Sequence, residues 1–300
     1  MRIGMIGLGR MGANMTLRLL RGDHEVVAYD VRPEAVEASA REGAIAASSL
    51  EELVNELQAP RAVWLMVPAG EITEATITEL SGLLSEGDVV VDGGNSRFTD
   101  SQRRAGMLAE KGIGLLDAGT SGGIWGLEEG FCLMVGGSAP DFATLEPAFA
   151  TLAPPGGYAH VGVSGAGHYT KMVHNGIEYA LMQAYGEGFD LLRAGELGID
   201  VGAVAELWRH GSVVRSWLLD LAARALTTDP DLSQVKGYVE DSGEGRWTVE
   251  QAIDSAIPAP TIALALFQRF ASRREDAFAD RLIAALRREF GGHGVREPGP

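Results

Sequence analysis

The chain has 300 residues, enough for two compact domains with a sizeable buried core. Its hydrophobic fraction of 46% and charged fraction of 22% are typical of a globular protein in water. The formal net charge of -16 argues against nucleic acid or an anionic membrane as a partner, because both attract cationic proteins. An anionic substrate would need cations gathered locally around it.

The first half alternates short apolar runs with amphipathic stretches such as residues 14–21 and 33–42. This alternation is typical of crossover connections in a mostly parallel sheet that is covered on both faces. The strand candidates are residues 3–6, 25–29, 62–67, 89–92, 115–118 and 131–135.

The second half is helical in pattern. Residues 166–197 predict one long helix, and further helices are expected at 203–209, 216–226, 248–257, 261–272 and 277–289. The sequence therefore predicts a Rossmann-type α/β domain over residues 1–163, followed by an all-α substrate and dimerisation domain over residues 164–300. We expect a homodimer or a higher homo-oligomer, because the helical half has little chain with which to cover its own apolar faces.

The sequence also carries indications of the compartment. No signal-peptide pattern precedes the first strand candidate, and no apolar run is long enough to span a bilayer. The single cysteine, Cys132, lies in an apolar run and is expected to be buried and inert. One cysteine allows no disulfide within the chain, which fits a reducing environment, so we expect a cytoplasmic protein.

A glycine-rich loop follows the first strand candidate and opens the first helix. It reads GLGRMG, and the first glycine permits a tight turn, the second lets backbone approach a pyrophosphate, and the third allows close helix packing. The helix N-terminus adds N–H groups and a positive dipole end. The residues expected to contact a nicotinamide dinucleotide here are Gly7, Leu8, Gly9, Arg10, Met11 and Gly12.

Asp30 closes the second strand candidate about twenty residues further on, where an acid can bind the adenine ribose hydroxyls. Its carboxylate would repel the 2′-phosphate of NADP, so NAD is favoured. Arg32 nearby can offset that repulsion, so NADP stays possible. Val67, at the end of the third strand candidate, and Asn95 complete the expected cofactor contacts.

One face of the predicted long helix is polar. Its members fall at i, i+3, i+4, i+7 and i+8, and they are Lys171, His174, Asn175, Glu178 and Tyr179. A solvated stripe is the alternative interpretation, but His, Asn and Tyr are poor helix formers on a surface. The chain holds only three lysines against 22 arginines, which suggests that Lys171 has a role closed to arginine. A buried lysine can lose its proton and act as a base.

The run GHYTKMVHNGIEY at residues 167–179 resembles the signature of the 6-phosphogluconate dehydrogenase family. Four further stretches agree with that family: residues 7–15, 92–96, 120–123, and 247–248 with their flanks. The chain is similar in length to the short bacterial form, which lacks a large part of the helical domain.

The resemblance implies the oxidative decarboxylation of 6-phospho-D-gluconate to D-ribulose 5-phosphate and CO2, a step of the pentose phosphate pathway, with reduction of NAD(P). Lys171 would accept the proton of the substrate 3-hydroxyl and then polarise the resulting ketone. Glu178 would protonate C1 of the enediol that remains after CO2 has left.

The resemblance also implies a substrate-binding set. Asn95 and the loop of residues 121–123 would hold the carboxylate and hydroxyls. Arg269 and Tyr179 would hold the phosphate. Arg287 and His293 would reach the site of a neighbouring subunit. The implied set is Asn95, Ser121, Gly122, Gly123, His174, Asn175, Tyr179, Arg269, Arg287 and His293. One position departs from the longer members, because Ser242 stands where they carry a phosphate-binding lysine.

Two other functions remain open at this point. One is oxidation of an unphosphorylated 3-hydroxy acid, which would need neither a second acid like Glu178 nor a phosphate clamp like Arg269. The other is a dinucleotide-binding regulator without catalysis, since a fold does not fix function. The histidines show no ligand spacing, so we expect no metal.

Overall fold

The computed structural model describes residues 1–296 and divides into two compact units, Met1–Asn175 and the residues from Gly176 onward. The division falls inside α8 (Ala166–Ala194), the long helix predicted at 166–197. Within the described residues, the strands all belong to the first unit, and the second unit is helical. The predicted fold class, a Rossmann-type α/β domain followed by an all-α domain, is confirmed.

An eight-stranded sheet with the order β3-β2-β1-β4-β5-β6-β7-β8 forms the centre of the first unit. Neighbouring strands are parallel except for the antiparallel pair β6–β7. The order reverses at β1, which pairs with β2 on one side and with β4 on the other, and ligands bind beside such reversals. The strands are β1 (Arg2–Ile6), β2 (Glu25–Tyr29), β3 (Ile45–Ala46), β4 (Ala62–Leu65), β5 (Val89–Asp92), β6 (Gly114–Ser121), β7 (Cys132–Gly136) and β8 (Tyr158–Gly162).

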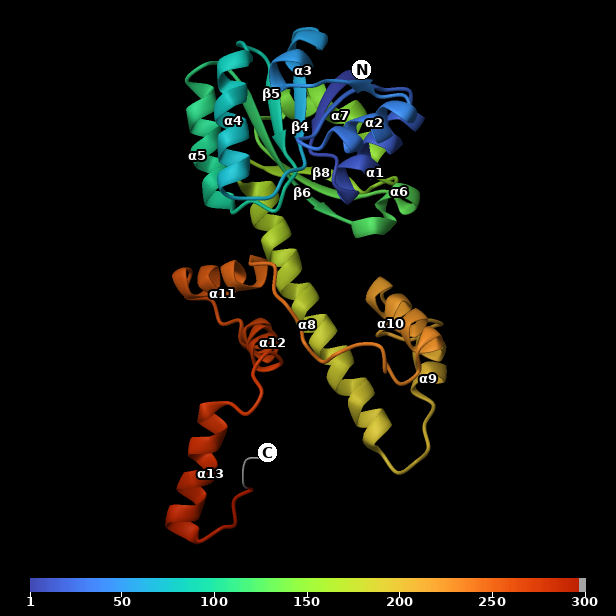
Figure 1. The fold of residues 1–300 in the computed structure, drawn as a ribbon, viewed down its shortest axis with the longest axis vertical. Coiled ribbons are helices and arrows are strands. Elements are labelled where there is room, and N and C mark those ends of the chain that lie inside the picture. The colour runs from blue at the N-terminus through green and yellow to red at the C-terminus, as the bar shows by residue number, and fades with distance from the viewer. Residues whose placement is uncertain (297–300) are drawn as a thin grey trace. The chain divides into compact units, whose positions relative to one another are not determined.

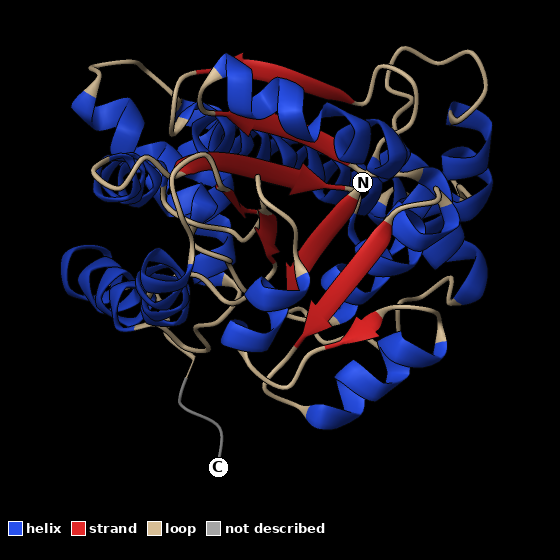
Figure 2. Cartoon of the chain, turned by 90° about the horizontal axis from the view of Figure 1, so that it is seen from above, coloured by secondary structure: helices blue, strands red, loops and turns tan. Residues whose placement is uncertain are grey.

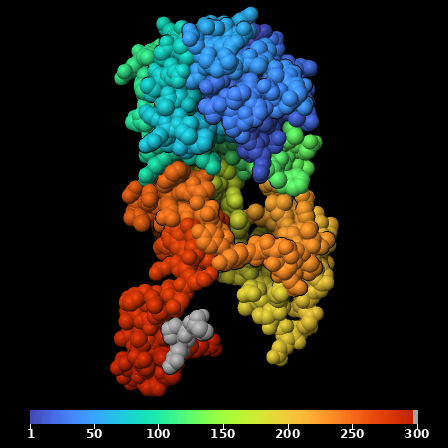
Figure 3. Space-filling view, viewed as in Figure 1, coloured from blue at the N-terminus to red at the C-terminus, as the bar shows by residue number. Residues whose placement is uncertain are grey.

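Helices cover both faces of this sheet (Figures 1 and 2). Alternate strand residues face opposite cores: Ile3 packs with Leu19 and Phe149, whereas Ile6 packs with Leu53. The space-filling view shows the covering helices and loops of this unit, coloured blue to green, as a continuous surface (Figure 3). They are α1 (Arg10–Arg21), α2 (Pro33–Arg41), α3 (Leu50–Glu56), α4 (Glu71–Leu83), α5 (Phe98–Ala109), a 3-10 turn (Gly123–Trp125), α6 (Gly126–Glu129) and α7 (Ala139–Leu152).

The edges of the sheet and the single cysteine differ from the sequence-based expectations. Strands β3 and β8 were not predicted, because β3 has only two residues and β8 has no fully buried position. Both lie at the edges of the sheet. The expected burial of Cys132 is wrong: it is exposed, since it opens β7 and the apolar residues that follow it fill the core.

The second unit packs its helices in two small clusters. Tyr179 of α8 packs with Ala265 and Leu266, and Ala205 packs with Leu219. Among the described residues, no helix is long and apolar enough to span a bilayer. The helices after α8 are α9 (Val201–Trp208), α10 (Trp217–Thr228), α11 (Glu244–Asp254), α12 (Pro260–Ala271) and α13 (Phe278–Gly291).

Candidate active site

The glycine-rich loop is a tight turn at the carboxyl end of β1. Gly7 has a φ of +91°, and a Cβ there would lie 2.5 Å from the carbonyl oxygen of Met66. A Cβ on Gly12 would lie 1.9 Å from the carbonyl oxygen of Gly7. A Cβ on Gly9 would meet no atom within 4 Å, and the first turn of α1 carries no acidic residue. The open space and the helix N-terminus fit the pyrophosphate of a dinucleotide.

Asp30 follows the last residue of β2 and binds the backbone of this loop. Its Oδ2 accepts the backbone N–H of Leu8 at 2.7 Å, and its Oδ1 accepts the backbone N–H of Arg32 at 2.9 Å. Burial opposes ionisation of Asp30, but hydrogen bonds from Arg32 and Leu8 outweigh it and lower its pKa. The guanidinium of Arg32 pairs with this carboxylate at 3.2 Å. Val67 lies against the same loop, since a Cβ on Gly7 would come within 3.0 Å of its Cγ1.

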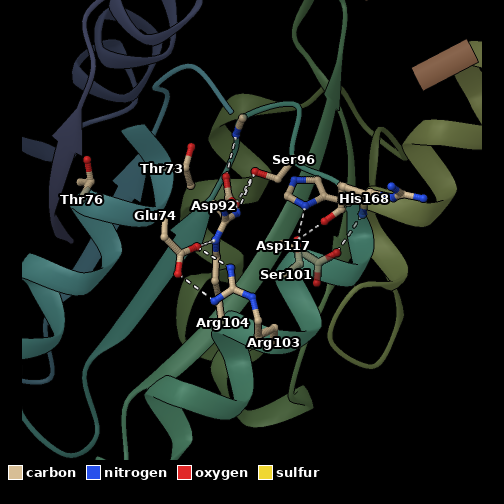
Figure 4. Close-up of polar contacts among 12 residues, drawn as sticks. Thr73, Glu74, Thr76, Asp92, Ser96, Ser101, Arg103, Arg104, Asp117 and His168 are labelled. Atoms are coloured by element: carbon tan, nitrogen blue, oxygen red, sulfur yellow. Dashed lines mark hydrogen bonds and ion pairs between the residues drawn. The ribbon is translucent and has the colours of Figure 1, made fainter. Parts of the chain in front are cut away.

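Asn95 is exposed in a loop that a buried polar network anchors (Figure 4). Asp92 at the end of β5 accepts the hydroxyl of Ser96 at 2.7 Å. Arg104 of α5 donates to Asp92 at 3.2 Å and to Glu74 of α4 at 2.9 Å. Because Asp92 and Arg104 are each 1% exposed, the network fixes the backbone on either side of Asn95.

The first half of α8 packs directly on β6. Lys171 is 9% exposed, and a Cβ added to Gly119 of β6 would lie 2.4 Å from the Lys171 Cβ. Ser121 at the end of β6 lies within 3.4 Å of His174, oxygen to Nε2. His174 Nδ1 in turn lies 2.9 Å from Asn175 Oδ1. The structure thus brings together Lys171, His174, Asn175 and Ser121, four of the predicted site residues.

Two glycines continue the chain from Ser121. Gly122 and Gly123 have φ values of +128° and +54°, and glycine adopts such conformations without strain. A Cβ on Gly123 would meet no atom within 4 Å. The predicted Ser-Gly-Gly loop therefore turns the chain sharply beside His174.

Asp117 is a residue of this region that the sequence analysis missed. It lies in β6, is 0% exposed, and accepts the backbone N–H groups of Gly165 at 2.7 Å and His168 at 2.8 Å. The His168 ring meets the Ser101 hydroxyl of α5 at 2.7 Å (Figure 4). The signal available in the sequence was an acid inside an apolar strand, which a buried partner must satisfy.

A second group of predicted residues lies in the helical unit. Arg269 of α12 stacks on the Tyr179 ring, with its Cζ 3.3 Å from the ring centroid, and its Nη1 donates to the Glu240 carbonyl at 2.9 Å. The backbone N–H of Ser242 donates to the Tyr179 hydroxyl at 3.1 Å. Gly245 allows this packing, because a Cβ there would lie 2.4 Å from the Tyr179 ring.

The remaining predicted catalytic and substrate-binding residues are Glu178, Arg287 and His293. Glu178 is half-buried on α8, one residue before Tyr179 and two turns after Lys171. Arg287 and His293 are exposed, and His293 packs edge-on against Phe290 at 6.4 Å. Over residues 1–296, no hydrogen bond or ion pair joins Arg287 or His293 to the Tyr179 and Arg269 group.

Comparison with known proteins agrees with this arrangement. Residues 2–165 match the family described as the NAD binding domain of 6-phosphogluconate dehydrogenase, and residues 167–289 match its C-terminal domain. A Haloferax volcanii protein named 6-phosphogluconate dehydrogenase, NAD(+)-dependent, decarboxylating, is 48% identical over 98% of this chain and 98% of its own length. A Bacillus subtilis protein of the same name is 36% identical over 94% of this chain but only 64% of its own.

A solved structure gives the same result in three dimensions. Plasmodium falciparum 6-phosphogluconate dehydrogenase superposes with a TM-score of 0.85 at 28% identity, over 100% of this chain and 67% of that one. The helix run at residues 167–179 and the glycine loop lie in the two matched families. The resemblance predicted from these motifs is confirmed, and the chain belongs to the 6-phosphogluconate dehydrogenase family.

Proposed function

We propose that the protein oxidatively decarboxylates 6-phospho-D-gluconate to D-ribulose 5-phosphate and CO2, with NAD preferred over NADP. The observation that carries the proposal is Lys171 of α8, which is buried against Gly119 of β6 on the same helix as His174 and Asn175, while His174 lies beside Ser121. Burial disfavours the charged form of a lysine, which suits it to accept a proton.

The cofactor would lie on the loop of residues 7–12. The N-terminus of α1 favours its pyrophosphate, and Asp30 has further lone pairs for a ribose hydroxyl. A dinucleotide bound there would supply the oxidant that takes up a hydride from C3 of the substrate. The NAD preference rests on Asp30, whose lowered pKa keeps a negative charge where NADP carries its extra phosphate, while Arg32 is bound to that carboxylate. We assign Val67 and Asn95 to the same cofactor site.

The chain's own groups would move the protons. Lys171 takes the proton of the 3-hydroxyl as C3 is oxidised, and its ammonium then polarises the 3-ketone while the C1–C2 bond breaks and CO2 leaves. Glu178 gives a proton to C1 of the enediol that remains. Lys171 and Glu178 are two turns apart in the sequence of one helix.

The substrate would be held by two sets of groups. Asn95, Ser121, Gly122, Gly123, His174 and Asn175 would bind its carboxylate and hydroxyls. Tyr179 and Arg269 would bind the phosphate, and the polar backbone at Ser242 borders them in place of a lysine. Oxidation of an unphosphorylated hydroxy acid would leave Tyr179, Arg269 and Glu178 without a task.

We also propose a homodimer with residues 1–163 as the dinucleotide-binding domain and 164–300 as the substrate and dimerisation domain. Helix α13 has no buried residue among those described, although it carries an apolar stripe. A second copy would cover that stripe and place Arg287 and His293 near its phosphate site. The exposed apolar residues of α13 are Phe278, Leu282, Ile283, Leu286 and Phe290.

The test is nicotinamide reduction with 6-phosphogluconate, run with NAD and NADP side by side while CO2 is collected. One CO2 for each reduced cofactor, with faster turnover on NAD, supports the proposal. Reduction without CO2 would point to a simple hydroxy-acid dehydrogenase instead.

A further inference from the structure

The N-terminal turn of α8 lies close to the sheet at the antiparallel pair β6–β7. A Cβ on Gly167 would lie 2.1 Å from the Asp117 carbonyl oxygen and 2.5 Å from that of Met134. A Cβ on Gly136, which pairs with Asp117 in β7, would lie 2.6 Å from the Gly167 nitrogen. Glycine at both positions lets helix and sheet backbones meet.

The side chain of Asp117 ties this contact together. Its Oδ1 accepts the N–H of Gly165 and its Oδ2 that of His168, so one carboxyl group binds two N–H groups at the start of the helix. Burial raises the pKa of Asp117, and the His168 ring and these N–H groups act in the opposite direction. A buried acid without partners is costly, and here both carboxyl oxygens accept N–H groups, one from Gly165 just before α8 and one from His168 in its first turn.

A second contact ties the same turn to another helix. The His168 ring, 2% exposed, meets the Ser101 hydroxyl of α5 at 2.7 Å (Figure 4). Lys171 follows His168 by three residues and therefore stands on the next turn of the same side. Its Cβ meets Gly119, two residues after Asp117 on the same face of β6.

We infer that Asp117 is a positioning residue for Lys171: by holding the N-terminus of α8 on β6, it sets the place of the proton-accepting amine. The inference rests on the proposed function of Lys171. Asp117 itself touches neither substrate nor cofactor in this scheme. A displacement of about 1 Å at a reacting group can lower a rate by about 10²-fold, so a small shift of α8 would be visible in turnover.

The experiment compares kcat, the KM for 6-phosphogluconate, the NAD dissociation constant and the melting temperature in the full-length protein. Asp117→Ala removes both acceptors, and we expect kcat to fall by about 10²-fold while NAD affinity stays within about twofold. Asp117→Asn keeps one acceptor and should recover part of kcat. Asp88→Ala is the matched control, since Asp88, immediately before β5, is also 0% exposed but accepts the N–H groups of Arg61 and Ser85 rather than those of α8.

A merely structural role predicts that Asp117→Ala and Asp88→Ala lose melting temperature alike and keep the same kcat, and that result would overturn the inference. Gly119→Ala serves if Asp117→Ala does not fold. It leaves the Asp117 bonds in place but puts a methyl 2.4 Å from the Lys171 Cβ. A loss of kcat with normal NAD affinity supports the inference, and unchanged kcat overturns it. A wild-type protein without turnover would instead overturn the proposed function.

Discussion

Arg269 stacks on the ring of Tyr179, with its guanidinium carbon 3.3 Å from the ring centroid. Its Nη1 is turned to the carbonyl of Glu240, which leaves further donors of the guanidinium for an anion. The pair forms a rigid cationic surface in a protein whose net charge is -16. This concentration of local charge is what an anionic substrate requires.

Replacing Arg269 should weaken substrate binding selectively. Arg269→Gln removes a charge-assisted contact with the phosphate, and we expect the KM for 6-phosphogluconate to rise by about 10- to 100-fold with NAD affinity unchanged. Steady-state kinetics measures both. Arg193→Gln is the control, because Arg193 makes an exposed ion pair with Asp231. Equal KM values in the two variants would remove Arg269 from the phosphate site.

Replacing Lys171 should abolish chemistry and spare cofactor binding. We expect Lys171→Met to lower kcat by at least about 10²- to 10⁴-fold, the usual contribution of general acid–base catalysis. Lys171→Arg should not restore it, since a guanidinium stays protonated. Lys111→Met is the control, because Lys111 follows α5 and donates to the Ser81 carbonyl of α4 at 2.7 Å. An active Lys171→Met enzyme is incompatible with a lysine base.

Asp30 should control the choice between NAD and NADP. Asp30→Asn removes the negative charge and releases Arg32, so we expect the ratio of kcat/KM for NAD to that for NADP to fall by about tenfold or more. The two cofactors are compared in one assay, with Glu37→Gln, an exposed acid of α2, as the control. A ratio that stays constant would show that Asp30 does not discriminate.

Protonation of Asp241 should lower the stability of the protein in acid. Hydrogen bonds from Arg246, opposed by burial, and from Arg273 lower its pKa to about 2 from an ordinary value of 3.8. A lowered pKa adds stability that is present above pH 3.8 and is lost as the pH falls toward 2, at most about 2 kcal/mol here. The melting temperature of Asp241→Asn should therefore change less with pH over this range than that of the wild type. The melting temperature of Asp231→Asn should follow the wild-type curve. Parallel curves for wild type and Asp241→Asn would contradict the prediction.

The apolar stripe of α13 should hold two copies together. Leu286→Glu puts a charge on that stripe, and we expect a smaller species in sedimentation velocity and a raised KM for 6-phosphogluconate. Asp280→Asn, which changes an exposed polar residue of the same helix that is not part of the apolar stripe, is the control. A wild-type protein that sediments as a monomer at assay concentration would end the homodimer proposal.

The sequence predicted those elements in which local pattern and burial coincide. The apolar run Val89–Asp92 is buried throughout, and the structure gives it the predicted bounds. The edge strands were not predicted because their side chains face solvent, as in Tyr158–Gly162, and so they lack an apolar run. Helix α11 begins at Glu244 rather than at 248, because the glycines around Glu244 suggest a loop while Gly245 in fact packs on Tyr179.

The candidate site was predictable where it follows a motif and not where it depends on packing. Lys171 and His174 came from helical spacing, and the structure sets them beside Ser121. Asp117 escaped because its partners, the N–H groups of Gly165 and His168, lie about fifty residues away and belong to the backbone. No side-chain pattern records such a bond.

The central claim is tested most directly by incubating the wild-type protein with NAD and 6-phosphogluconate labelled at C1, and by measuring NADH and labelled CO2 together. We predict equal amounts of both products, and neither product with Lys171→Met. NADH without labelled CO2, or no reduction of either NAD or NADP, would contradict the proposed reaction.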